Sequence, residues 1–168
     1  DGVKPVKDAQ VLHRALSYAQ PFGFVIVQHA EEPSLSAGGV MNAGETATRL
    51  GLAGTPVEAE IIMVERDIRL AKMTGGRLHF AHLSTAEAVD AVRNAKNAGL
   101  HITCDTAPPY FALNELAVGD YRTFAKLSPP LRAEKDRQAI IAGLIDGTID
   151  TVASDHRPED EEAKRLYK

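Results

Sequence analysis

Apolar residues follow two different spacings along this chain, and the two spacings alternate. In residues 8–19 the apolar positions recur every three to four residues after the N-cap residue Asp8, which predicts an amphipathic helix. Residues 24–29 form a short run rich in β-branched residues, which predicts a strand. Strands that alternate with helices predict an α/β fold with a parallel sheet and right-handed crossovers. The same patterns predict three more helices, at 56–73, 85–98 and 133–146, and three more strands, at 77–83, 101–106 and 149–154.

The segments between these elements differ in length and composition. Residues 31–54 are rich in Gly, Ala and Ser, and a connection of this length after a strand is typical of a functional loop or a lid. Two helix starts carry the capping-box pattern, at Thr55–Glu58 and at Ser84–Glu87. Residues 107–110 contain two prolines and are predicted to be a loop with a short helical turn after it. Residues 126–132 are too rich in proline for a central strand and are predicted to be an ordered loop.

Composition and charge narrow the class of protein. The 168 residues are enough for one domain with a core of its own, and the net charge of −4 offers no basic surface for nucleic acid. No apolar run approaches the roughly 20 residues that cross a membrane, and the first residues lack the apolar core of a signal peptide. The single cysteine, Cys104, lies inside a predicted strand, so we expect a buried thiol in a reducing compartment. We therefore expect a cytoplasmic protein.

Three predicted strands end in side chains of the kinds that bind metals. The first strand ends at His29, the second carries His82 near its end, and Asp155 follows the fourth. The carboxyl ends of parallel strands meet at one end of a barrel, where the active sites of that fold lie. This arrangement predicts a hydrolytic metal site. A histidine at a strand end is also commonly a hydrogen-bonded structural residue, which is the alternative for each of the two.

Alternation within the strands predicts which side chains share a face with this site. His79 falls on the opposite face from His82 and is predicted to be a packing residue. Counting back by twos from each strand end puts small or apolar residues behind the predicted ligands, where they would fill the interior of a barrel. These are Val25 and Val27 behind His29, Leu78 and Phe80 behind His82, and Thr151 and Ala153 behind Asp155.

Several segments of the chain together carry a resemblance to a known family. They resemble consecutive signatures of the dihydroorotases of the amidohydrolase superfamily. The resemblance implies a (β/α)8 TIM barrel of the metal-dependent hydrolase type, of which residues 1–168 would form a partial catalytic domain, from about the fourth to the eighth strand. The His-x-His pair that the family places on its first strand is absent from this chain. The segments are Asp1-Gly2, Gln28–Glu32, His79–Thr85, Ser128–Arg132 and Ser154–Pro158.

The resemblance implies a site for one or two zinc ions. Asp1 resembles the carboxylate that bridges the metals, and His29 and His82 resemble the histidines on the second metal. Asp155 resembles the aspartate that binds the first metal and carries the proton. Zinc lowers the pKa of bound water to about 7, which makes that water a nucleophile toward a ring amide. Asp155 would act as the catalytic base and then as the acid, in the reversible interconversion of dihydroorotate and N-carbamoyl-L-aspartate in pyrimidine biosynthesis.

The resemblance also indicates four positions for the substrate, namely Ser128, Pro129, Arg157 and Glu159. Many family members have asparagine where this chain has Ser128, and a histidine that holds the substrate carboxylate where this chain has Glu159. A glutamate facing the pocket would repel that carboxylate. We therefore expect Glu159 to turn outward into solvent, and Arg157 or an arginine further upstream to bind the carboxylate through charge-assisted hydrogen bonds.

Two other functions fit the same residues. Another cyclic amidase, such as a hydantoinase or an allantoinase, would use a carbamylated lysine where Asp1 stands, so the residues just upstream would discriminate. A non-catalytic dihydroorotase-like subunit that scaffolds aspartate transcarbamoylase fits the altered substrate positions, whereas the retained metal-type side chains argue against it. As partners we expect a small-molecule substrate, a second copy of the chain and aspartate transcarbamoylase, and neither nucleic acid nor a membrane.

Overall fold

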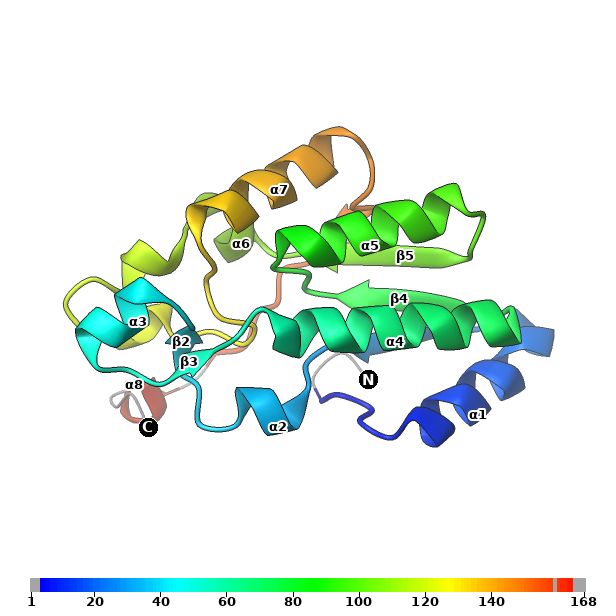
Figure 1. The fold of residues 1–168 in the computed structure, drawn as a ribbon, viewed down its shortest axis with the longest axis horizontal. Helices are drawn as coiled ribbons and strands as arrows, with labels where there is room; N and C mark the ends of the chain where they lie inside the picture. The colour runs from blue at the N-terminus through cyan, green and yellow to red at the C-terminus, as the bar shows by residue number, and fades with distance from the viewer. Residues whose placement is uncertain (1–3, 159, 165–168) are drawn as a thin grey trace.

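A four-stranded parallel sheet forms the centre of the protein (Figure 1). The structure is a computed structural model that describes residues 4–158 and 160–164. All four predicted strands are confirmed, although the strand predicted at 77–83 ends at Ala81 and the strand predicted at 149–154 spans only Thr151–Val152. In their order across the sheet, with every neighbouring pair parallel, the strands are β1 (Val25–His29), β4 (Arg77–Ala81), β5 (Ile102–Thr106) and β6 (Thr151–Val152).

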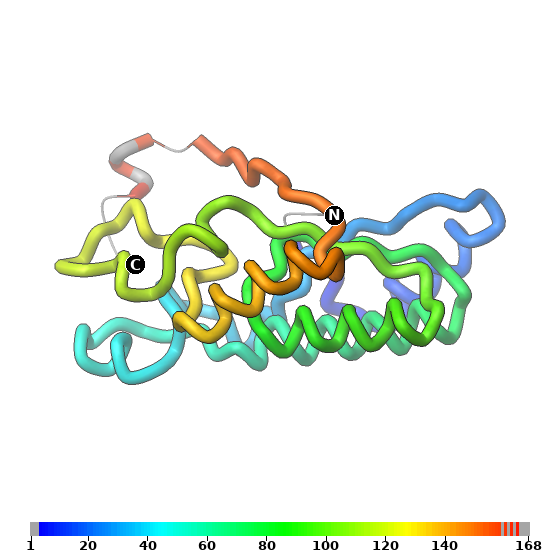
Figure 2. Tube along the Cα trace, turned by 90° about the horizontal axis from the view of Figure 1, so that it is seen from above, coloured from blue at the N-terminus to red at the C-terminus, as the bar shows by residue number. Residues whose placement is uncertain are grey.

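The long helices lie on one face of this sheet (Figures 1 and 2). Their apolar sides pack with alternate residues of the central strands, Leu78 and Phe80 of β4 and Ile102 and Cys104 of β5, into the main core. Asp8 caps the first helix as predicted, because its carboxylate accepts hydrogen bonds from two backbone N–H groups of the first turn. The helices are α1 (Ala9–Ala19), α4 (Glu58–Thr74), α5 (Ala86–Asn97) and α7 (Glu134–Ile145).

The other face of the sheet is more exposed. On β1, the side chains of Val25 and Val27 are 43% and 39% exposed, and Thr103 of β5 is also exposed. β1 and β6 are the two outer strands of the four-stranded sheet. An open parallel sheet with two outer strands agrees with the expectation that this chain forms only part of a closed barrel.

The predicted alternation was wrong for β4. Leu78 and Phe80 pack against the helices in the main core rather than toward a barrel interior. His79 therefore lies on the more exposed face of the sheet, where it contacts Thr103 and Asp105 of the neighbouring strand. The alternation was counted back from His82, which lies one residue beyond the strand end and does not continue its period.

Residues 31–55 fold into a small unit rather than a plain loop. The unit packs with Tyr110 and Leu131 in a second apolar cluster. The predicted capping box at Thr55–Glu58 was wrong, because Thr55 pairs in a short strand and α4 begins at Glu58 without a side-chain cap. In chain order the unit contains α2 (Pro33–Ser36), β2 (Met41–Asn42), α3 (Glu45–Leu50) and β3 (Gly54–Thr55), with β2 and β3 parallel.

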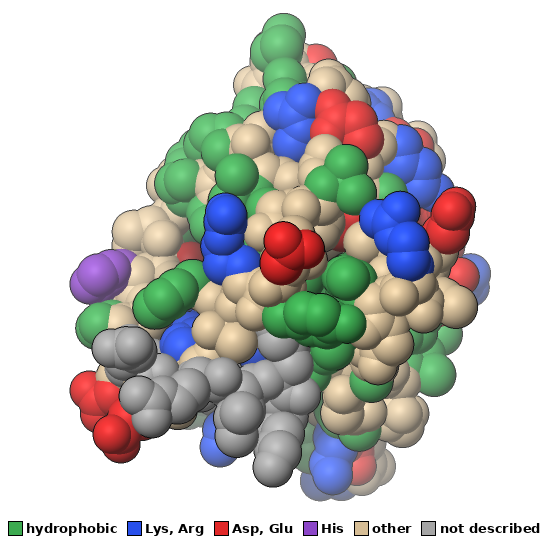
Figure 3. All heavy atoms as spheres, turned by 90° about the vertical axis from the view of Figure 1, so that its left-hand side faces the viewer, with side chains coloured by type: hydrophobic (Ala, Val, Ile, Leu, Met, Phe, Trp, Pro, Cys, Tyr) green, Lys and Arg blue, Asp and Glu red, His purple; other side chains and the backbone are tan. Residues whose placement is uncertain are grey.

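The remaining connections contain short helices. The predicted loop at 107–110 was wrong in part, because Pro108 and Pro109 begin a helix, a position at which a missing N–H costs nothing. Residues 126–132 have no regular structure, as predicted. Figure 3 looks onto the end of the molecule where α3 lies, and apolar side chains there are interspersed with charged ones. The short helices are η1 (Gln20–Phe22), α6 (Pro108–Ala112), η2 (Glu115–Val118), η3 (Thr123–Ala125) and α8 (Glu161–Lys164).

None of the helices in the described part of the chain combines the length and the apolar character needed to cross a bilayer.

Candidate metal centre and active site

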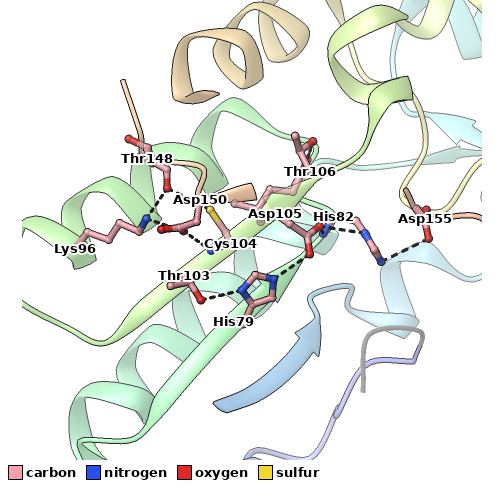
Figure 4. A network of polar contacts seen from close by, with 11 residues as sticks. His79, His82, Lys96, Thr103, Cys104, Asp105, Thr106, Thr148, Asp150 and Asp155 are labelled. Atoms are coloured by element: carbon pink, nitrogen blue, oxygen red, sulfur yellow. Dashed lines mark hydrogen bonds and ion pairs between the residues drawn. The ribbon is translucent and has the colours of Figure 1, made fainter. Parts of the chain in front are cut away.

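Polar side chains gather where the strands of the main sheet end. β1 ends at His29, and His82 follows β4 by one residue. Asp105 is the fourth residue of β5, and Asp155 lies three residues beyond β6. Because parallel strands end at the same edge of a sheet, the side chains come together there, and Figure 4 shows His82 between Asp105 and Asp155.

His29 is buried and has two differently placed ring nitrogens. Its Nε2 lies 3.3 Å from Oε2 of Glu31. Its Nδ1 is buried and has no hydrogen-bond partner among the described residues. Burial raises the pKa of Glu31, but the hydrogen bond to His29 and the positive charge of nearby Arg132 outweigh it and bring that pKa below its usual value. Glu31 is thus an anion that fixes Nε2, which leaves Nδ1 as the nitrogen suited to bind a ligand.

His82 lies between two carboxylates. Its Nε2 is 3.6 Å from Oδ1 of Asp155, and its Nδ1 is 3.3 Å from Oδ1 of Asp105. The rings of His29 and His82 have their centroids 6.3 Å apart. The structure thus brings together His29, His82 and Asp155, the three predicted ligands that it describes. Asp1, the fourth, lies outside the described residues.

Asp105 and His79 form a part of the site that the sequence analysis missed. Oδ2 of Asp105 lies 2.9 Å from Nε2 of His79, whose Nδ1 lies 2.8 Å from Oγ1 of Thr103. The prediction that His79 is a packing residue was therefore wrong. Burial raises the pKa of Asp105, but its hydrogen bonds to His79 and His82 outweigh burial and hold that pKa well below the usual range. The signal in the sequence was an acid near a strand end, the same signal that identified Asp155.

A pocket of about 480 Å³ lies beside Asp155. Among the predicted substrate residues, Ser128 and Arg157 line this pocket. Nε of Arg157 lies 3.3 Å from Oδ1 of Asp155. Pro129 is not in the pocket lining: it is buried, and its carbonyl accepts a hydrogen bond from the Tyr110 hydroxyl at 2.9 Å. Glu159 lies outside the described residues, so its expected outward orientation stays a prediction.

A buried arginine joins the loops around the site. Arg132 donates from Nε to Oγ of Ser84 at 3.1 Å and from Nη1 to Oδ1 of Asn42 at 3.1 Å and the carbonyl of Thr55 at 3.0 Å. The hydroxyl and the amide of Ser84 donate in turn to the buried carboxylate of Glu60. One side chain therefore ties residues 31–55 to the connection between β4 and α5.

The side chains present suit a zinc ion. Among the described residues, no group of three or more His, Cys, Asp or Glu side chains is close enough to hold an ion by itself. The buried Nδ1 of His29 without a hydrogen-bond partner is nevertheless a donor atom in need of a ligand. Two imidazoles and a carboxylate are a donor set that zinc prefers. His29, His82 and Asp155 therefore fit as part of a zinc site.

Sequence comparison gives a family. The family model described as Dihydro-orotase-like matches residues 2–88. A protein named Dihydroorotase from Desulforapulum autotrophicum is 51% identical over 158 residues, which cover 94% of this chain and 37% of that protein. A second, from Acetivibrio thermocellus, is 46% identical over 166 residues, 99% of this chain and 39% of that protein. The chain thus spans less than two-fifths of the length of these relatives.

Structural comparison gives the fold. A D-hydantoinase (dihydropyrimidinase) from Thermus sp. superposes with a TM-score of 0.81 and 27% identity over 95% of this chain and 36% of that one. A dihydropyrimidinase from Brevibacillus agri superposes with a TM-score of 0.77 and 26% identity over 94% of this chain and 36% of that one. The predicted fold, part of a (β/α)8 barrel, is therefore confirmed. With the family model covering more than half of its length, the chain belongs to the dihydro-orotase-like family.

Proposed function

We propose that the full-length protein to which this chain belongs is a zinc-dependent dihydroorotase, which interconverts dihydroorotate and N-carbamoyl-L-aspartate. The observation that carries this proposal is the 51% identity over 94% of the chain to a relative named Dihydroorotase. The convergence of His29, His82 and Asp155 at the strand ends supports it. A scaffolding subunit would have no need of such a constellation.

The residues of this chain would divide the work of holding the metal. His29 would present Nδ1, because Glu31 already engages Nε2. His82 would present Nε2, which faces Asp155, because its Nδ1 lies against Asp105. Zinc, when bound, supplies a Lewis acid that polarises the ring carbonyl and makes water a better nucleophile at neutral pH.

Asp155 would move the proton. In the hydrolytic direction, water adds to the carbonyl carbon of the ring amide, and Asp155 accepts the proton that the water loses. The ring C–N bond then breaks, and Asp155 returns this proton to the leaving nitrogen, so that the ring opens to a carboxylate and a ureido group. The carboxylate of Asp155 is 17% exposed and lines the pocket, which gives it access to a substrate.

Arg157 would bind the substrate carboxylate. It lines the same pocket as Asp155, together with Ser128 and the cationic side chains of Lys126 and Lys164. A charge-assisted hydrogen bond contributes about 1.5–3 kcal/mol, so we expect Arg157→Gln to raise the KM for dihydroorotate about 10- to 100-fold. Because Arg157 does not exchange protons with the ring amide, kcat should change less than KM.

The test uses the full-length protein, its metal content and its ring-opening activity on dihydroorotate. We expect bound zinc, loss of activity on treatment with a chelator, and recovery on addition of zinc. Asp155→Asn should lower kcat about 10²- to 10⁴-fold, because a general base contributes that much. Asp150→Asn is the matched control, because Asp150 binds Lys96 and the amide of Cys104 on the neighbouring strand. It should keep its activity.

The structural neighbours make cyclic amidases of the hydantoinase kind the second candidate. Hydantoin and dihydrouracil therefore belong in the same assay. Ring opening of either at a higher kcat/KM than that of dihydroorotate would overturn the proposed substrate. Absence of all three activities from a zinc-loaded protein would favour the non-catalytic subunit, and association with aspartate transcarbamoylase or a second copy stays a prediction.

A further inference from the structure

The placement of His82 does not follow from the strand that precedes it. Leu78 and Phe80 on β4 point into the core beneath the helices. A regular continuation of that alternation would send His82 to the same side, because side chains two residues apart share a face. Instead His82 has a φ of 59°, and its ring lies against Asp155. The left-handed backbone of His82 thus redirects the ring, and such a conformation is costly for a residue with a Cβ and needs support.

Asp105 supplies that support from the neighbouring strand. Its Oδ1 accepts a hydrogen bond from the backbone N–H of His82 at 2.8 Å. The same oxygen lies 3.3 Å from Nδ1 of the His82 ring. The backbone carbonyl of Asp105 accepts from the N–H of Leu83 at 2.9 Å, and the Thr106 hydroxyl donates to the Leu83 carbonyl at 3.0 Å. The end of β5 therefore holds both the turn and the ring.

The carboxylate of Asp105 is itself held in place. Its second oxygen, Oδ2, lies 2.9 Å from Nε2 of His79, and Thr103 engages the other nitrogen of that ring at 2.8 Å. Figure 4 shows this chain of contacts from Thr103 through His79 and Asp105 to His82. The side chain of Asp105 is 9% exposed, so water has little access to replace these partners. Each oxygen of the Asp105 carboxylate therefore contacts a different histidine.

We propose that Asp105, braced by His79, is a positioning residue that turns His82 toward the site and fixes its ring so that Nε2 is presented to the metal. The proposal rests on the proposed function for the identity of the ligand, zinc. It goes further in assigning the orientation of His82 to a residue on another strand. A carboxylate on the far nitrogen of a ligating histidine fixes the tautomer and raises the basicity of the ring, and its loss typically weakens metal binding about 10- to 100-fold.

The first test measures zinc affinity of the full-length protein by competition with a chromophoric chelator. Asp105→Asn keeps the size of the side chain and an oxygen for the His82 amide but removes the negative charge, and we expect zinc to bind about 10- to 100-fold more weakly. The cobalt-substituted variant should show a changed visible absorption spectrum. Asp136→Asn is the matched control, because Asp136 is a buried carboxylate that accepts a hydrogen bond from the amide of Ala86. It should bind zinc as tightly as the parent.

The second test needs no metal. In the metal-free protein, Asp105→Ala removes the acceptor for the His82 amide, and hydrogen exchange in a peptide that spans residues 79–85 should become at least about tenfold faster. His79→Gln keeps Asp105 but removes the imidazole that contacts its Oδ2. This variant tests the proposal if the Asp105 variants do not fold. We expect it to weaken zinc binding by a smaller factor than Asp105→Asn, about three- to tenfold.

The outcomes separate this proposal from the proposed function. Zinc affinity within twofold of the parent in both Asp105→Asn and His79→Gln would overturn the positioning role, as would unchanged exchange in Asp105→Ala. If the parent itself binds no zinc, the proposed function loses its metal, whereas the exchange measurement still decides whether Asp105 holds His82.

Discussion

Replacing Arg132 by methionine should destabilise the protein without opening a cavity. Methionine keeps most of the aliphatic length of arginine, so the main change is the loss of hydrogen-bond donors. Arg132 is 3% exposed, and it donates to Ser84 Oγ, Asn42 Oδ1 and the Thr55 carbonyl. Three oxygens around a buried position therefore lose a donor at once.

The magnitude follows from the burial of those oxygens. Each buried acceptor left without a donor costs about 1–3 kcal/mol. Ser84 keeps a second partner in Glu60 and loses least. The Thr55 carbonyl keeps the backbone N–H of Ala43 at 3.0 Å, so Oδ1 of Asn42 is the acceptor that loses most. We therefore expect a loss of about 2–4 kcal/mol in the free energy of unfolding, from one buried acceptor left without a donor and two hydrogen bonds to a charged group that are lost.

Urea unfolding of the full-length protein, followed by circular dichroism, measures this loss. Arg93→Met is the matched control, because Arg93 pairs with Asp90 and Asp146 at the surface, where ion pairs contribute little. The Arg132 variant should unfold at a clearly lower urea concentration, and the control should unfold close to the parent. A loss of less than about 1 kcal/mol for Arg132→Met would show that the three acceptors find other donors, and would refute the reasoning.

Three further predictions concern buried groups. Burial raises the pKa of the Cys104 thiol to about 12, so a disulfide reagent at pH 8 should modify it only as fast as the protein unfolds; a rapid reaction in the native state would contradict this. Burial also raises the pKa of Asp67, and this acid therefore costs stability as the pH rises from the usual aspartate value, about 4, through its raised folded value. Over that pH interval the free energy of unfolding of Asp67→Asn should rise relative to that of the parent, as measured by urea unfolding at a series of pH values. A difference between the two proteins that does not change with pH would contradict this. In Gly54→Ala the new Cβ would lie 2.4 Å from Cα of Ala43, whereas Gly44→Ala meets nothing within 4 Å. Limited proteolysis should therefore cut residues 31–55 faster in the first variant and not in the second, and equal rates would exclude the clash.

Local periodicity was sufficient for the elements whose burial is set by their own residues. The apolar spacing of residues 8–19 predicted α1, and Gly75 with a left-handed backbone ends α4 close to the predicted residue. The short apolar runs predicted β1, β4 and β5, because each strand lies against helices whose apolar sides cover one of its faces. In these cases the pattern of one segment contains the information on which face is buried.

Elements whose conformation is set by residues distant in the chain could not be predicted from local periodicity. Thr55 has the sequence pattern of a helix cap, but it pairs instead with Asn42 in a two-residue strand, and its carbonyl accepts from Arg132. The local sequence could not predict this, because Asn42 and Arg132, the residues with which Thr55 interacts instead, lie 13 and 77 residues away in the chain. The small unit at residues 31–55 was likewise invisible, because its apolar cluster is completed by residues such as Tyr110.

His82 shows how a side chain can reach the predicted site although the strand pattern used to support that prediction was wrong. The alternation counted back from His82 placed Leu78 and Phe80 on its face of the strand, and both lie in the core instead. The ring nevertheless reaches Asp155, because a carboxylate 23 residues later in the chain holds the left-handed turn. A strand pattern specifies the direction of side chains only up to the last regular residue. Beyond it, the partner that holds the turn decides the direction, so a ligand at a strand end and the acid that holds it are better sought together.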